Sequence, residues 1–73
     1  MSKFVVGVDL GGTKISVGAV AADGSRVLAF HTGLTHAEEG DEAVAARIAA
    51  KINAVIAETG LARSECAGVG MGR

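Results

Sequence analysis

The chain has 73 residues, a net charge of −1 and a single cysteine, Cys66, which excludes a disulfide framework. No apolar run approaches the roughly 20 residues of a membrane-spanning helix, and the mixed charges give no basic surface for nucleic acid or an anionic membrane. Because 49% of the residues are hydrophobic, general disorder is also excluded. The composition therefore predicts a cytoplasmic α/β segment without a nucleic-acid or membrane partner.

The first part of the chain is predicted to form three antiparallel strands. Residues 4–8 are a β-branched run without clean alternation, which is typical of a strand buried on both faces. Gly11-Gly12 allows a positive φ and a tight reversal, after which residues 14–20 alternate as a second strand. Asp23-Gly24 is a turn signal, and residues 27–31 form the third strand of a meander.

The second part is predicted to be a helix followed by a fourth strand. Five apolar residues recur at the spacing of one helix face: Val44, Ile48, Ile52, Val55 and Ile56. Asp41 is the expected N-cap and Gly60 the expected stop. Residues 67–71 then form a strand. The resulting βββαβ order predicts a mixed sheet with a helix on one face.

Residues 9–14, Asp-Leu-Gly-Gly-Thr-Lys, form the one pattern with a chemical interpretation. Glycines let a ligand approach the backbone, and successive amides of a turn can point at one anion. Thr13 adds a hydroxyl donor and Lys14 a positive charge, while Asp9 suits a phosphate site if a divalent cation lies between the two anions. A Walker A loop requires Lys before Thr and leads into a helix, as a dinucleotide-binding loop does, whereas here a strand follows. From spacing alone, a plain Gly-Gly turn is an equal alternative.

Residues 8–15, Val-Asp-Leu-Gly-Gly-Thr-Lys-Ile, resemble the first phosphate loop of the actin-like ATPase superfamily. The Gly-Gly-Thr-Lys-Ile form is most similar to the ROK family of repressors and sugar kinases, especially the bacterial glucokinases. The Asp23-Gly24 turn, the connection at residues 35–40 and the glycine-rich residues 68–72 agree in kind. The resemblance implies an actin-like, ribonuclease H-like half-domain, with residues 1–73 as the N-terminal part of the small nucleotide-binding lobe and the second lobe outside them.

The resemblance also implies how the loop is used. The backbone of Gly11 and Gly12 and the hydroxyl of Thr13 would contact the ATP phosphates, with electrostatic help from Lys14. Asp9 would organise Mg²⁺ through water. The family's catalytic aspartate, second phosphate loop and zinc ligands lie beyond residue 73, so this segment is expected to supply no catalytic residue and no zinc ligand.

The function expected from this resemblance is an ATP-dependent hexose kinase, homodimeric at full length, that converts ATP and glucose to ADP and glucose 6-phosphate. Kinases for fructose, N-acetylglucosamine or N-acetylmannosamine, and polyphosphate as the donor, stay open. Gly70 and Gly72 would either line the sugar-facing loop or simply allow strands to pack. The chain alone is expected to be marginally folded and to lack kinase activity.

Three other functions are alternatives. A ROK repressor is disfavoured because the first strand begins at Phe4, which leaves no room for a winged helix-turn-helix. A chaperone or filament ATPase fits Lys14-Ile15 less well, and the chain could also be an inactive structural fragment.

The remaining polar residues are expected to have structural roles. His31 and His36 are predicted to lie on the surface, Cys66 to be a small core residue and Glu38-Glu39 to be a solvated pair. Family members often have proline where this chain has His36, so that the connection before the helix is expected to be loosened.

Overall fold

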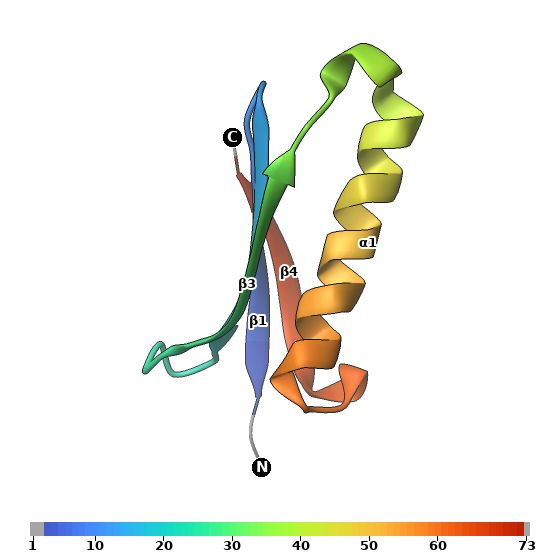
Figure 1. Cartoon of the computed structure of the whole chain (residues 1–73). Helices are drawn as coiled ribbons and strands as arrows, with labels where there is room; N and C mark the ends of the chain where they lie inside the picture. The colour runs from blue at the N-terminus through green and yellow to red at the C-terminus, as the bar shows by residue number, and fades with distance from the viewer. Residues whose placement is uncertain (1–2, 73) are drawn as a thin grey trace.

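The computed structural model describes residues 3–72, which form a four-stranded sheet and one long helix (Figure 1). The elements are β1 (Phe4–Leu10), β2 (Lys14–Ala21), β3 (Val27–Leu34), α1 (Asp41–Thr59) and β4 (Cys66–Gly72), with the short 3-10 helices η1 (Ala37–Glu39) and η2 (Arg63–Glu65) on either side of α1. The predicted βββαβ order is confirmed, and every strand extends by one to three residues beyond its predicted bounds.

The sheet is mixed, with the strand order β3-β2-β1-β4. β1 and β2 pair as an antiparallel hairpin, β3 adds to β2 antiparallel, and β4 runs parallel to β1. The helix between β3 and β4 lies along one face of the sheet (Figure 1). A parallel neighbour requires such a crossover, because the chain must return to the starting edge before β4 can begin. The predicted meander, crossover helix and mixed sheet are thus all present.

The core lies between α1 and the face of the sheet that it covers. Its buried apolar residues are Phe4, Val6, Val8, Ile15, Val17, Ala19, Ala29, Ile48, Val55 and Ile56. The helical stripe predicted from the sequence supplies three of them, and its other members, Val44 and Ile52, pack against the same cluster. Burial of this apolar surface is the main force that holds helix and sheet together.

The prediction that β1 is buried on both faces is wrong for this chain. Phe4, Val6 and Val8 face the core, whereas Val5, Gly7 and Asp9 alternate with them and are exposed. The opposite face of the sheet, called the open face below, also carries Phe30, with 58% of its surface exposed. The missing alternation in the sequence arises because valines occupy both faces of β1.

The helix begins one residue earlier than a cap at Asp41 would require. Gly40 is the N-cap with a φ of 97°, and Asp41 is the first helical residue. At this position the Asp41 carboxylate still lies in the first turn, where negative charge interacts favourably with the helix dipole. Gly60 ends the helix as predicted, with a φ of 73° and its N–H donated to the Ala57 carbonyl.

Replacing Gly60 by alanine is expected to lower the free energy of unfolding by about 1 kcal/mol, because a Cβ is strained in the left-handed region. Gly68→Ala is the matched control: Gly68 lies in β4 without a positive φ, and an added Cβ meets no atom within 4 Å. Urea unfolding followed by circular dichroism measures both. Equal losses in the two variants would contradict the role of Gly60 as a left-handed cap.

Within residues 3–72, no helix combines the length and the hydropathy needed to cross a membrane.

Candidate functional site

The loop between β1 and β2 is a tight two-residue reversal. The N–H of Gly11 donates to the Lys14 carbonyl at 2.9 Å, which leaves only Gly12 and Thr13 at the tip. Neither glycine has a positive φ, so the expected conformational reason for Gly11-Gly12 does not apply. A Cβ on Gly11 would instead lie 3.1 Å from the Lys14 carbonyl oxygen. Glycine is therefore favoured at residue 11 because the two backbone segments approach closely.

The free backbone donors of this loop belong to Gly12 and Thr13. Gly11 uses its N–H inside the hairpin, whereas the N–H groups of Gly12 and Thr13 make no hydrogen bond to the described part of the chain. Both residues are exposed, as is Lys14 at the start of β2. Two adjacent amides beside a lysine can receive an anion such as a phosphate. Of the two glycine amides predicted to contact phosphate, only that of Gly12 is free, because the Gly11 N–H already donates to the Lys14 carbonyl.

Asp9 lies near the end of β1 on the open face. Its neighbours in the sheet register are Ser16 on β2 and Gly72 on β4, so no bulky side chain stands beside it. The Asp9 carboxylate is exposed. Mg²⁺ commonly takes one or two protein carboxylates and completes its shell with water and phosphate oxygens. A single accessible carboxylate one residue from the end of β1 fits such a partial site.

A hollow of about 620 Å³ on the open face contains Asp9 and both of the glycines predicted for the sugar side. Gly70 and Gly72 lie on β4, across β1 from Gly18 and Ser16. The rest of the lining is mainly apolar and includes Phe30. The structure thus places Asp9, Gly70 and Gly72 around one hollow, as a site that holds both the metal-bound phosphates and the sugar would require.

Gly11 and Gly12 line a different cavity, of about 330 Å³, on the helix side of the sheet. Its other walls include Thr35 and Asp41. Because the hairpin tip and the start of α1 lie at the same end of the molecule, this cavity forms between them (Figure 1). The predicted site residues are therefore divided between the two faces, with the hairpin tip between the two hollows.

Thr35 anchors the hairpin and was missed by the sequence analysis. This residue follows β3 and is 3% exposed. Its hydroxyl donates to the Gly11 carbonyl at 2.9 Å, and its N–H donates to the Thr13 carbonyl at 2.8 Å. Its own carbonyl accepts a hydrogen bond of 3.0 Å from the Arg47 guanidinium on α1. The loop is thus connected through one buried threonine to the helix.

The side chains of His36, Glu38 and Glu39 offer potential metal-ligand atoms within 4.8 Å of one another. All three residues are exposed. Glu39 is ion-paired with Arg47, and the His36 ring hydrogen-bonds the Glu38 carboxylate at 3.2 Å. The Glu38 N–H, and then the His36 ring, lower the pKa of that carboxyl. Glu38 and Glu39 are both exposed, as predicted, and each makes a separate polar contact, Glu38 with His36 and Glu39 with Arg47.

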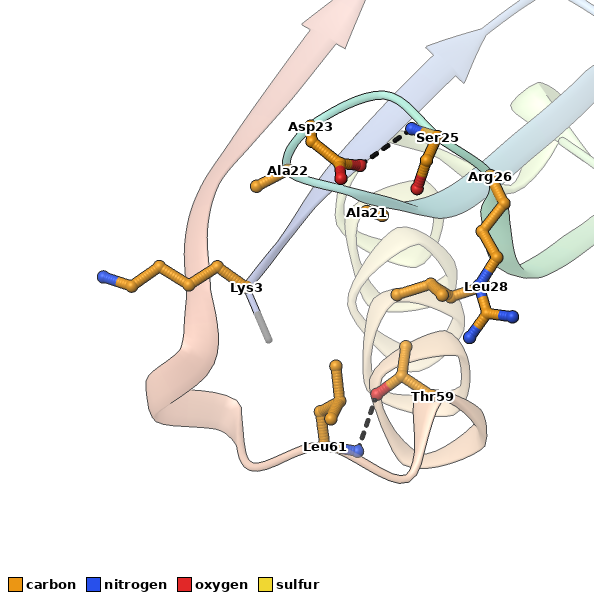
Figure 2. Close-up of a pocket in the computed structure, with 9 residues that line it drawn as sticks. All are labelled: Lys3, Ala21, Ala22, Asp23, Ser25, Arg26, Leu28, Thr59 and Leu61. Atoms are coloured by element: carbon orange, nitrogen blue, oxygen red, sulfur yellow. Dashed lines mark hydrogen bonds between the residues drawn. The ribbon is translucent and has the colours of Figure 1, made fainter. Parts of the chain in front are cut away.

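A third hollow, of about 550 Å³, lies at the opposite end of the sheet (Figure 2). Its charged lining residues do not converge, since Lys3 extends away from Arg26 (Figure 2). Asp23 accepts a hydrogen bond from the Ser25 N–H at 2.9 Å within the β2–β3 turn. The Ser25 side chain, and then its N–H, lower the pKa of Asp23. Asp23 and Ser25 in this hollow are therefore engaged with each other in the turn, and Thr59 is engaged at the end of α1.

The remaining sequence predictions concern His31 and Cys66. His31 is partly exposed and contacts Glu58 of α1, so it bridges sheet and helix at the surface. Cys66 is half-buried and packs against the edge of the core.

No protein-family model matches this chain, and no curated protein matches its sequence.

Proposed function

We propose that this chain is the N-terminal part of the nucleotide-binding lobe of an ATP-dependent hexose kinase, in which the β1–β2 hairpin holds the phosphates of MgATP. The observation that carries the proposal is the set of groups around the hairpin tip. The free amides of Gly12 and Thr13 adjoin the exposed Lys14, and Asp9 precedes the loop on the open face. This combination suits a polyphosphate and a divalent cation.

The chemistry of phosphoryl transfer explains why hydrogen-bond donors, a lysine and a carboxylate are sufficient to bind the phosphate donor. Transfer depends mainly on positioning and on stabilising the charge of the phosphates. The amides of Gly12 and Thr13 and the Thr13 hydroxyl would bind phosphate oxygens, and Lys14 would attract the anion. When bound, Mg²⁺ neutralises the phosphate charge, and Asp9 would hold its water ligands. None of these residues removes a proton from a sugar, which is why the chain alone is expected to be inactive.

The fold and the sequence pattern support the same proposal. The three-stranded meander, the crossover helix and β4 parallel to β1 fit the start of an actin-like ATPase lobe. The Gly-Gly-Thr-Lys-Ile sequence at residues 11–15 resembles the ROK kinases within that class, and its similarity to the glucokinases makes glucose the first acceptor to test. Gly70 and Gly72 would then face the acceptor across the open-face hollow.

A titration of the ¹⁵N-labelled chain with MgATP tests the proposal. The Gly12 and Thr13 amides are expected to shift most, and omitting Mg²⁺ should weaken binding. Lys14→Gln should weaken binding by about two- to fivefold, because an exposed charge contributes little in water. Lys3→Gln is the matched control, since it removes the same charge at the other end of β1. Shifts confined to the hollow around Lys3, or no shifts at all, would overturn the proposal.

A further inference from the structure

The hydrogen bonds around Thr35 form one continuous path from α1 to the hairpin. Arg47 on the helix donates to the Thr35 carbonyl, and Thr35 donates to the carbonyls of Gly11 and Thr13. Arg47 is also ion-paired with Glu39 in η1, which restricts its guanidinium. The path therefore joins three segments that are remote in sequence, and only its last contacts touch the loop.

Thr35 hydrogen-bonds two carbonyl groups of the hairpin loop and leaves the loop's Gly12 and Thr13 amides free. The two acceptors are the carbonyls of Gly11 and Thr13, whereas the N–H groups of Gly12 and Thr13 make no bond to the described residues. A hydrogen bond to a carbonyl fixes the orientation of the peptide plane that follows it, and with it the next N–H. The Thr35 hydroxyl thereby orients the Gly12 N–H, because it holds the peptide that joins Gly11 to Gly12.

We propose that Thr35 is a positioning residue for the hairpin, which keeps the Gly12 amide pre-oriented for a phosphate group. The identity of that ligand depends on the function proposed above, but the positioning of the loop does not. A loop that is held in place before binding loses less conformational freedom when the ligand arrives, so affinity is higher than for a mobile loop. Burial strengthens this effect, since water cannot easily replace the hydroxyl of a threonine that is 3% exposed.

Thr35→Val removes the hydroxyl with almost no change in shape and keeps the N–H that bonds Thr13. We expect the exchange of the Gly11 amide with solvent to become at least about tenfold faster, which corresponds to about 1.4 kcal/mol. Amides at the centre of β1, such as that of Val6, should keep their exchange rates. Thr35→Ser, which restores a hydroxyl, should recover most of the protection. Amide exchange followed by nuclear magnetic resonance measures all of these without any ligand.

Thr32→Val is the matched control, because Thr32 is exposed on β3 and its hydroxyl forms no hydrogen bond to the described residues. It should leave the exchange of Gly11 unchanged. A Gly11 rate that is the same in Thr35→Val as in the unmodified chain would overturn the proposal. If Thr35→Val unfolds, Arg47→Met provides the second variant: it removes the donor to Thr35, and should speed exchange at Gly11 more than at Val6. Equal acceleration at both residues would overturn the proposal as well.

MgATP titration of the same variants separates this inference from the proposed function. Thr35→Val should weaken MgATP binding about fivefold to tenfold, and Thr35→Ser by no more than about twofold. If the unmodified chain binds no MgATP, the proposed function fails, whereas faster Gly11 exchange in Thr35→Val still supports positioning. If MgATP binds equally to all variants, the loop is not pre-oriented by Thr35 for this ligand, and the inference fails while the proposed function stands.

Discussion

Phe4→Ala is expected to unfold most of the chain. Phe4 is fully buried at the start of β1, within the core between the sheet and α1. Truncating a buried phenylalanine to alanine typically costs about 3–5 kcal/mol, through lost burial and the cavity that is left. A domain of this size has a total stability of only about 4–11 kcal/mol, and a marginally folded chain, as this one is expected to be, lies at the low end of that range. Urea unfolding should therefore show a midpoint near zero denaturant or no folded baseline.

Phe30→Ala provides the control for this prediction, because the chain has two phenylalanines and the second is 58% exposed. The same atoms are removed from the open face, where the Phe30 ring lies near Gly18. We expect a loss below about 1 kcal/mol, as for most surface substitutions. A loss as large as that of Phe4→Ala would show that the open face contributes to stability as much as the core does.

The two phenylalanines also illustrate how far the sequence determines the fold. The alternation of residues 14–20 and the helical stripe from Val44 to Ile56 each identify one apolar face, and both faces are buried as predicted. Phe4 and Phe30 have the same side chain, but only one is covered by α1. Local patterns record which residues are apolar. Which of them are covered depends on the crossover, which places the helix on one face only.

The candidate site was predictable in composition but not in geometry. Residues 9–14 are glycine-rich and polar, so the sequence alone indicated a loop suited to an anion. The use of the Gly11 amide within the hairpin depends on a backbone approach that no residue pattern encodes. The contact between Thr35 and Gly11 joins residues 24 apart, and becomes visible only when β3 pairs with β2. A signal was available in hindsight, since Thr35 directly follows a strand that pairs with the start of β2.

His36 shows a second limit of the sequence analysis. Its φ of 52° lies in the left-handed region, which proline cannot adopt because its ring holds φ near about −65°. The connection is therefore built differently from one with proline at this position. At the β3 end of this connection, the hydroxyl, the carbonyl and the N–H of Thr35 are all hydrogen-bonded. That His36 loosens the connection relative to proline stays a prediction.

Asp9→Ala is expected to have the largest effect on activity in the intact kinase that the proposed function implies. The Asp9 carboxylate stands one residue before the end of β1, exposed between Ser16 and Gly72. There it would hold Mg²⁺ and its waters against the phosphates as charge shifts in the transition state. Losing one such preorganised stabilising group typically lowers kcat by about 100- to 1,000-fold. The KM for glucose should change little, because the carboxylate contacts the donor side.

Asp23→Asn is the matched control for this substitution, since it also removes one carboxylate charge but lies in the β2–β3 turn at the other end of the sheet. Its kcat should match that of the unmodified enzyme. Raising the Mg²⁺ concentration should restore only part of the activity of Asp9→Ala, because the ion can bind the nucleotide without being oriented by the protein. Steady-state kinetics at several Mg²⁺ concentrations measures each of these effects. An unchanged kcat in Asp9→Ala would remove Asp9 from the site, and the amides of Gly12 and Thr13 would then have to bind the phosphates without a carboxylate-held cation.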